Sequence, residues 1–112
     1  MAKFALRFRA VNKDIFEALR KGTKKIETRA GSPRYLGIQA GDVLVFVCGK
    51  NSFSKKVKSV RKFKSVKALH RVYKPVAINP KIRTVSESEQ MYYSFPGYRE
   101  KIKKYGILAF EL

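Results

Sequence analysis

A compact group of charged side chains occupies the segment from Gly22 to Arg29, where a lysine, a glutamate and an arginine lie close together. In an extended chain side chains alternate between two faces, so Ile26 is expected to point inward while Glu27 and Arg29 share the opposite face. Alternation does not fix the direction of Lys24. A carboxylate between cations keeps its charge and accepts charge-assisted hydrogen bonds. Such a cluster can bind a polar ligand or transfer a proton, and it can equally be an ion pair that orders the fold.

The elements on either side of this cluster must position it. The apolar residues between Asn12 and Lys21 recur with helical spacing, Asn12 is a candidate N-cap, and Gly22 is a typical C-terminal stop. The segment around residues 25–29 then reads as a short strand. The alternating residues 3–9 predict another half-buried strand before the helix.

The remainder of the chain alternates between further strands and helices. The apolar run 43–47 predicts a central strand, and residues 53–64 predict one long strand with a bulge at Val57 or Val60. Ser65 is expected to cap a second helix that stops before Pro75, followed by a loop over residues 76–83. Thr84 or Ser86 could open a third helix. A short fourth helix over 98–105 and a final strand over 106–112 complete an α+β pattern.

Three landmarks resemble those of a known family. The first is G-x-K-x-x-E-x-R, spelled by Gly22, Lys24, Glu27 and Arg29; the others are residues 37–42 (GIQAGD), before an apolar strand, and residues 105–110 (YGILAF). Together they resemble the ASCH family of the PUA-like superfamily. The resemblance implies one domain spanning residues 1–112, a small mixed or antiparallel PUA-like β-barrel with three or four peripheral helices.

The resemblance also implies candidate catalytic residues. Family members that hydrolyse acylated cytosine nucleosides use a lysine, a threonine and a glutamate, and Lys24 matches the lysine. Glu27 stands where the threonine is expected, so the hydroxyl nucleophile is missing there, and Glu87 or Glu89 could supply a second acid. Other members cut single-stranded RNA without metal, a reaction for which Glu27 could act in acid–base catalysis while Lys24 and Arg29 stabilise phosphorane charge.

The net charge is the strongest signal in the composition. Twenty-six basic residues face eight acidic ones, which leaves a net charge of +18 on 112 residues. A surface this far from charge balance favours a polyanionic partner, most simply nucleic acid. A lysine-rich composition without a partner is the alternative, although such compositions normally bring acidic residues with them.

The excess of cations is greatest between Val43 and Ser86, where there is no Asp or Glu. If the strand and helix predicted there are adjacent, their cations form one positive face that contacts phosphates without sequence specificity. The alternative is a solvated basic surface that binds nothing. The residues assigned to this nucleic-acid surface are Lys55, Lys56, Lys58, Arg61, Lys62, Lys64, Lys67, Arg71 and Lys74.

Other residues could complete a ligand site or belong to the core. Arg34 and Tyr35 lie in the loop after the charged cluster and are assigned to the ligand pocket. Phe53, Phe95 and Tyr98, like Tyr35, fall near turns, where an aromatic ring could stack on a base or simply pack.

Several classes of protein are disfavoured by the sequence. A single cysteine, Cys48, rules out an intrachain disulfide and a cysteine cluster, and one histidine, His70, disfavours a zinc site, so no metal or cofactor is expected. The first residues lack the layout of a signal peptide, and no apolar run is long enough to cross a membrane. The expectation is a cytoplasmic protein without a membrane partner.

The sequence therefore predicts an RNA- or nucleotide-binding domain whose pocket is built by Lys24, Glu27, Arg29 and the following loop. A hydrolase acting on RNA or on an acylated cytosine nucleoside through the same residues is the first alternative. The second is an accessory module associated with the ribosome or with an acidic protein.

Overall fold

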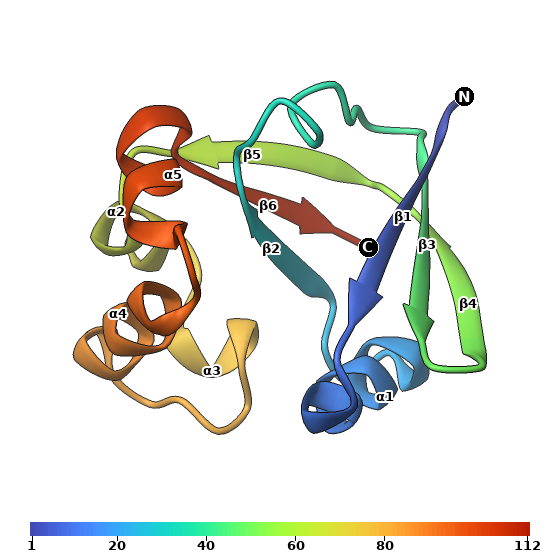
Figure 1. Cartoon of the computed structure of the whole chain (residues 1–112), viewed down its shortest axis with the longest axis horizontal. Helices are drawn as coiled ribbons and strands as arrows, with labels where there is room; N and C mark the ends of the chain where they lie inside the picture. The colour runs from blue at the N-terminus through green and yellow to red at the C-terminus, as the bar shows by residue number, and fades with distance from the viewer.

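Two three-stranded sheets form the framework of the computed structural model, which describes all residues from 1 to 112 (Figure 1). The first sheet has the order β1-β3-β4 and consists of β1 (Lys3–Phe8), β3 (Val43–Cys48) and β4 (Asn51–Lys56). β1 runs parallel to β3, and β3 pairs with β4 as an antiparallel hairpin. The apolar run therefore lies in the centre of this sheet, as predicted.

The second sheet is antiparallel throughout, with the order β2-β6-β5. It consists of β2 (Ile26–Ala30), β6 (Ile107–Glu111) and β5 (Ser59–Phe63). The strand that carries the charged cluster is thus an edge strand, and the last strand of the chain is its only neighbour. This pairing joins residues about eighty positions apart in sequence: Glu27 lies opposite Phe110 and Arg29 opposite Leu108.

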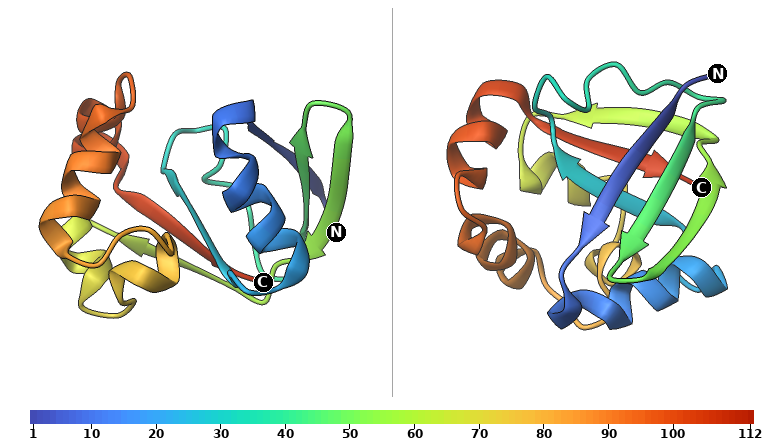
Figure 2. Two further views of the ribbon diagram at one scale, coloured as in Figure 1. Left: turned by 90° about the horizontal axis from the view of Figure 1, so that it is seen from below. Right: turned by 45° about the vertical axis from the view of Figure 1, so that its right-hand side comes forward.

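Five α-helices accompany the sheets, one more than the upper number expected. Four of them gather beside the second sheet, and α1 lies beneath the ends of β1 and β3 (Figures 1 and 2). A short 3-10 turn leads into α1. The helices are α1 (Lys13–Lys21), α2 (Val66–His70), α3 (Pro75–Ile78), α4 (Val85–Ser94) and α5 (Tyr98–Tyr105).

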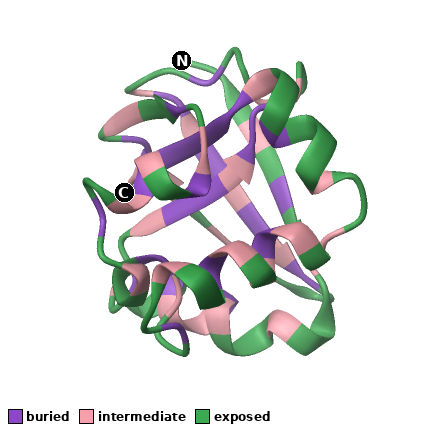
Figure 3. Ribbon diagram, turned by 90° about the vertical axis from the view of Figure 1, so that its left-hand side faces the viewer, coloured by how far each residue is buried: buried purple, intermediate pink, exposed green.

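Two hydrophobic clusters fill the interior, and β6 contributes to both. Leu108 and Phe110 belong to the first cluster, with residues of α1, β1 and β3, whereas Ile107 and Ala109 belong to the second, with residues of α2, α4 and α5. Successive side chains of a strand point to opposite faces, so one strand can serve two cores. Figure 3 shows this burial along the strands and the exposed outer faces of the helices.

The chain departs from the predicted elements in three places. The expected long strand 53–64 is two strands, because at Val57 and Lys58 the backbone leaves the first sheet and bonds to Asp42 and then Glu111, entering the second. The expected loop 76–83 begins with α3, whose first residue is Pro75, a residue well suited to the start of a helix. Asn12 occupies the N-cap position of α1 but makes no side-chain capping bond.

Helix α4 begins with a capping box, and the structure selects Thr84 over Ser86 as its N-cap. The Thr84 hydroxyl accepts the Glu87 backbone N–H at 3.1 Å, and the Glu87 carboxylate accepts the Thr84 N–H at 3.1 Å. Replacing Thr84 with alanine is expected to lower the free energy of unfolding by about 1 kcal/mol, because the orphan N–H groups lose their acceptor. Urea unfolding measures the change. The neighbouring Ser86→Ala, at an exposed position, is the matched control; equal effects of both would contradict this cap.

None of the helices combines the length and the apolar composition that crossing a membrane would require.

Candidate functional site

A pocket of about 370 Å³ opens where β1 and β2 face the helices, and it contains the charged cluster. The end of β1 and the start of α1 line one side. Residues of α3, α4 and α5 line the other, and β2 supplies the floor. The polar and charged lining comprises Arg7, Arg9, Asn12, Lys24, Glu27, Thr28, Arg29, Asn79, Tyr92 and Tyr98.

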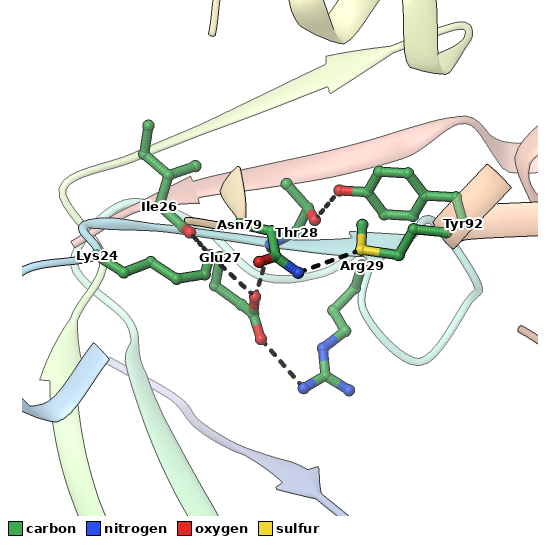
Figure 4. Close-up of polar contacts among 8 residues, drawn as sticks. Lys24, Ile26, Glu27, Thr28, Arg29, Asn79 and Tyr92 are labelled. Atoms are coloured by element: carbon green, nitrogen blue, oxygen red, sulfur yellow. Dashed lines mark hydrogen bonds and ion pairs between the residues drawn. The ribbon is translucent and has the colours of Figure 1, made fainter. Parts of the chain in front are cut away.

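Lys24, Glu27 and Arg29 converge at the floor of this pocket, as the sequence predicted (Figure 4). The Lys24 ammonium lies 3.6 Å from Glu27 Oε1, and the Arg29 guanidinium donates to Glu27 Oε2 at 3.2 Å. Glu27 Oε1 also accepts the Thr28 backbone N–H at 3.0 Å. The carboxylate is therefore held from three directions, which fixes its orientation.

Glu27 and Lys24 are both buried, with 6% and 4% of their surface exposed. Ion pairs at this depth differ from surface pairs, because both charges have given up most of their water. Burial lowers the pKa of the Lys24 ammonium, while Glu27 acts in the opposite direction. Lys24 also donates to the carbonyl oxygen of Ile26, so two acceptors compensate for its lost water.

Local structure explains how Lys24 reaches the pocket. Gly22 ends α1 in the left-handed conformation, with φ of 82°, and reverses the chain direction. The Lys24 backbone N–H then bonds back to the Ala18 carbonyl oxygen at 3.0 Å, which holds the turn against the helix. Lys24 therefore lies in a turn before β2, where strand alternation does not apply.

The alternation predicted for β2 is partly confirmed. Ile26 is half-buried and packs against the second hydrophobic cluster, while Glu27 and Arg29 share the other face and touch. That other face is covered rather than open, because α1 and the helices beyond β2 enclose it as the pocket.

Aromatic rings form much of the apolar wall. The Arg29 guanidinium lies over the Phe8 ring, 5.0 Å from its centroid. Tyr92 and Tyr98 stack with centroids 6.4 Å apart, and Phe95 meets Tyr98 edge-on at 5.0 Å. Phe95 and Tyr98 are thus near the charged cluster, whereas Tyr35 and Phe53 pack against the first hydrophobic cluster and do not line the pocket.

Thr28 also lines the pocket, and its hydroxyl is bonded to Tyr92. Their two hydroxyl groups hydrogen-bond to each other (Figure 4), and burial raises the pKa of Tyr92 so that its phenol stays protonated. Thr23, the other threonine near the motif, instead donates to the Ala18 carbonyl oxygen at an exposed position. Of these two threonines, only Thr28 lines the pocket, and its side chain lies on the opposite side of β2 from that of Glu27 (Figure 4).

Several pocket residues were not predicted from the sequence. Arg7 and Arg9 looked like the polar face of a strand, and Asn79 lay in an expected loop. Tyr92 lies on a helix far along the chain. No spacing in the sequence connects these residues to Glu27, since the fold alone brings β1, α3 and α4 to β2.

The other residues assigned to the ligand site lie outside the pocket, which corrects the sequence prediction. Arg34 is exposed and lies over the Tyr35 ring, 5.5 Å from its centroid. Glu87 is exposed and occupied by the capping box, where the N–H groups of Arg83 and Thr84 lower the pKa of its carboxyl. Glu89 does not line the pocket either, so neither glutamate stands beside Glu27 as a second acid.

The nine cations assigned to a nucleic-acid surface point outward, eight being exposed and Lys55 half-buried. None of them lines the pocket or forms an ion pair. Those on β5 and α2 belong to elements that pack against each other, whereas Lys55 and Lys56 lie on β4 in the other sheet. The cations are therefore distributed along β4, β5, α2 and the adjoining segments, and they do not lie on one face of a single sheet.

His70 has a partner that the sequence did not reveal. Its Nε2 lies 2.6 Å from the Ser88 hydroxyl, and its Nδ1 lies 2.9 Å from the Tyr73 carbonyl oxygen. Ser88 is buried, with 1% exposed, and no pocket adjoins it. This pair links α2 to α4 as a structural contact.

The pocket offers one carboxylate, and nowhere does the structure group three His, Cys, Asp or Glu side chains that could hold a metal ion. What it does offer is a fixed hydrogen-bond acceptor with cations beside it and aromatic faces around it. These are groups that bind a planar, partly charged ligand.

No family model matches the chain, and no curated protein matches it. Two solved structures are similar over nearly their whole length. Hypothetical protein PH0355 is 28% identical with a TM-score of 0.83, covering 97% of this chain and 95% of that one. Protein PF0455 from Pyrococcus furiosus is 28% identical with a TM-score of 0.76, covering 97% of this chain and 94% of that one. The chain therefore shares its α+β fold with these two proteins over nearly all of its length.

Proposed function

We propose that this chain is an RNA- or nucleotide-binding domain of the ASCH type, which holds a nucleobase in the pocket around Glu27. One observation carries the proposal: a buried carboxylate, fixed between Lys24 and Arg29, lies at the floor of a pocket with aromatic walls. The net charge of +18 supports a polyanionic ligand.

The Glu27 carboxylate is suited to accept a hydrogen bond from a donor group on a base. An ionised carboxylate has about four lone-pair positions and only accepts. Oε1 faces Lys24 and the Thr28 N–H, whereas Oε2 has the single Arg29 contact, so one position on Oε2 is free for a ligand. The exocyclic amino group of cytosine, adenine or guanine is a donor of the kind that a glutamate accepts. Uracil lacks that group.

The surrounding residues suit the rest of a nucleotide. Bases stack on aromatic side chains, and Phe8, Phe95 and Tyr98 line the same pocket. Arg7 and Arg9 are exposed at the pocket margin, at the end of β1, where a phosphate would remain partly in water. The pocket thus has a hydrogen-bond acceptor at its floor and cations at its edge. A nucleotide with its base at the floor would place its phosphate near those cations.

The fold also supports assignment to the PUA-like superfamily. The first sheet passes directly into the second at Val57 and Lys58, and the Leu112 N–H bonds to the Lys25 carbonyl oxygen at 2.9 Å beside β2. We propose that the two sheets together correspond to a PUA-like barrel, with the helices outside it.

Titration of nucleoside monophosphates tests the proposal through base preference. The wild-type chain is expected to bind CMP, AMP or GMP more tightly than UMP. Glu27→Gln is expected to weaken binding of the preferred amino-bearing nucleotide by about 10- to 100-fold, the usual cost of losing a matched base contact. Binding of UMP should weaken less, because a glutamine amide can donate to the uracil carbonyl. Isothermal titration calorimetry at low salt measures each affinity.

Glu17→Gln is the matched control, because it removes one carboxylate from an exposed ion pair on α1 outside the pocket. It should leave every affinity within about twofold, as surface pairs contribute little. If Glu27→Gln is folded by circular dichroism but loses affinity equally for all four nucleotides, Glu27 does not discriminate between bases. Failure of the wild-type chain to bind any nucleotide or RNA would overturn the proposed function.

A hydrolase is the second candidate, supported by Lys24 and Glu27. Burial lowers the pKa of Lys24, which makes its ammonium a better proton donor, and the Glu27 carboxylate lies 3.6 Å from that ammonium in the same pocket. In that case Lys24 would donate a proton and Glu27 would activate water or a hydroxyl. Degradation of single-stranded RNA in EDTA, or release of acetate from acetylated cytidine, that disappears in Glu27→Gln would establish this activity over binding alone.

A further inference from the structure

A second hollow, of about 490 Å³, lies between the end of β5 and the end of α5. Four of its eight lining residues are lysines, and the others are Phe63, Ile102, Tyr105 and Gly106. It shares no residue with the pocket around Glu27. The lysines are Lys62, Lys64, Lys103 and Lys104, of which only the first two belong to the basic surface that the sequence analysis identified.

These four lysines have no protein counter-charge. All four are exposed, no acidic residue lines the hollow, and none of the four takes part in an ion pair or a side-chain hydrogen bond. Like charges gathered around a concave surface repel one another, and they focus a positive potential there. A bound anion would relieve that repulsion.

The backbone around the hollow is fixed and already paired. The Gly106 N–H bonds to the Ile102 carbonyl oxygen at 2.8 Å, and the Gly106 carbonyl oxygen accepts the Gly31 N–H at 2.9 Å. These backbone groups are therefore unavailable to a ligand. An anion in the hollow would be held by the lysine ammonium groups, which suits a phosphate group that is contacted without regard to base sequence.

Helix α5 connects this hollow to the pocket around Glu27. Tyr98 at its first position lines the pocket, and Lys103 and Lys104 in its last turn line the hollow. At 1.5 Å per residue, the rise from Tyr98 to Lys104 is roughly 9 Å. Because successive residues of a helix turn by about 100°, Lys103 and Lys104 lie on a different side of α5 from Tyr98, so an RNA strand that reaches both sites must pass around the helix.

We propose that the lysine hollow binds backbone phosphates of a single-stranded RNA whose base occupies the pocket around Glu27. The proposal rests on the proposed RNA-binding function for its ligand, and it adds Lys103 and Lys104 to the interface. RNA is favoured over a free polyphosphate because Lys62 and Lys64 continue into the exposed cations of β5 and α2, which provide a path for a chain of phosphates.

Salt dependence of RNA binding tests this proposal. Each phosphate contact to a single strand contributes about −0.7 to the slope of log K against log salt. Lys103→Gln with Lys104→Gln is expected to make the slope for a fluorescent ten-nucleotide oligocytidine, whose bases carry the amino group that Glu27 accepts, shallower by about 1.4, and to weaken binding about 10- to 30-fold at 0.1 M salt. Fluorescence anisotropy at several salt concentrations measures both quantities.

The matched control removes two other exposed lysines, Lys3 and Lys50, which line neither cavity. That double variant should weaken RNA binding by at most about threefold through the lower net charge alone. Equal slopes for the two double variants would overturn the proposal. Circular dichroism establishes that both are folded, since Lys103 and Lys104 also lie favourably at the C-terminal end of α5.

Two further measurements separate this inference from the proposed function. Binding of the preferred nucleoside monophosphate should be unchanged, within about twofold, in the Lys103/Lys104 variant, because the pocket is intact. Conversely, inorganic pyrophosphate should shift the amide resonance of Gly106 by the same amount in the wild type and in Glu27→Gln. A shift with pyrophosphate, but no loss of RNA affinity in the lysine variant, would identify a free-polyphosphate site and refute the RNA contact.

Discussion

Replacing Glu27 with alanine is expected to lower the free energy of unfolding by about 3–5 kcal/mol at pH 7, one of the largest effects of any single substitution in this chain. The reason is that Lys24, with 4% of its surface exposed, would keep its charge in the interior without its carboxylate partner. Arg29 would lose the same partner, although it is more exposed than Lys24. Urea unfolding monitored by circular dichroism measures the loss.

The pH dependence of this loss identifies Lys24 as its origin. Glu27 raises the pKa of Lys24, and burial lowers it below the ordinary value of 10.5. Without Glu27 the folded-state pKa falls further, so between that pKa and 10.5 the folded chain binds fewer protons than the unfolded chain. Unfolding free energy then rises with pH. The deficit of Glu27→Ala relative to wild type is therefore expected to shrink from pH 7 towards pH 10.

A second substitution provides the control for Glu27→Ala. Adding Lys24→Met to Glu27→Ala should recover a large part of the lost stability, because an unpaired buried charge is replaced by an apolar side chain. Two results would contradict this explanation: a double variant as unstable as Glu27→Ala alone, or a stability deficit of Glu27→Ala that does not change with pH. Either result would show that the lost stability comes from lost packing and not from the charge of Lys24.

Replacing Gly106 with alanine is expected to lower the free energy of unfolding by about 3 kcal/mol or more. Gly106 has φ of 80° and ψ of −166°, a backbone region that is essentially restricted to glycine. A Cβ atom there would also lie 2.4 Å from the carbonyl oxygen of Phe63, which is backbone and cannot rotate away. Thermal and urea unfolding both report the change.

Gly37→Ala is the matched comparison, because a Cβ at Gly37 meets nothing within 4 Å and its φ lies outside the left-handed range. That variant should be neutral or stabilised by up to about 1 kcal/mol through the lower entropy of the unfolded chain. Similar stability of Gly106→Ala and Gly37→Ala would show that β5 and α5 can separate at the lysine hollow without cost.

Local sequence was sufficient to predict most elements of this fold. Helix α1 ends at Gly22 as expected, α4 begins at the capping box of Thr84, and the apolar run 43–47 forms a central strand. These features depend on residues within a few positions of one another, whose spacing sets backbone hydrogen bonding directly. The predictions of strand boundaries failed where the hydrogen-bond partner of a segment is distant in sequence. The break at Val57 follows from bonds to Asp42 and Glu111, which no local pattern records.

The same distinction between local and long-range contacts applies to the residues of the candidate site. The motif from Gly22 to Arg29 was enough to group Lys24, Glu27 and Arg29, because all three lie in one turn and one short strand. Glu87 looked equally suitable as an acid, yet its carboxylate is committed to a helix cap at an exposed position. The type of residue could suggest its chemistry, but its distance from Glu27 depends on how α4 packs.

The sequence by itself determined the excess of positive charge, the positions of most helices and strands, and the three charged residues of the pocket floor. Only the tertiary structure decided that Glu27 and Lys24 are buried, that Arg7 and Tyr92 line the same pocket, and that four lysines surround a second hollow. The physical reason is that burial and long-range neighbours follow from packing. The pairing of β2 with β6 and the placement of α4 and α5 beside that sheet join parts of the chain that are distant in sequence.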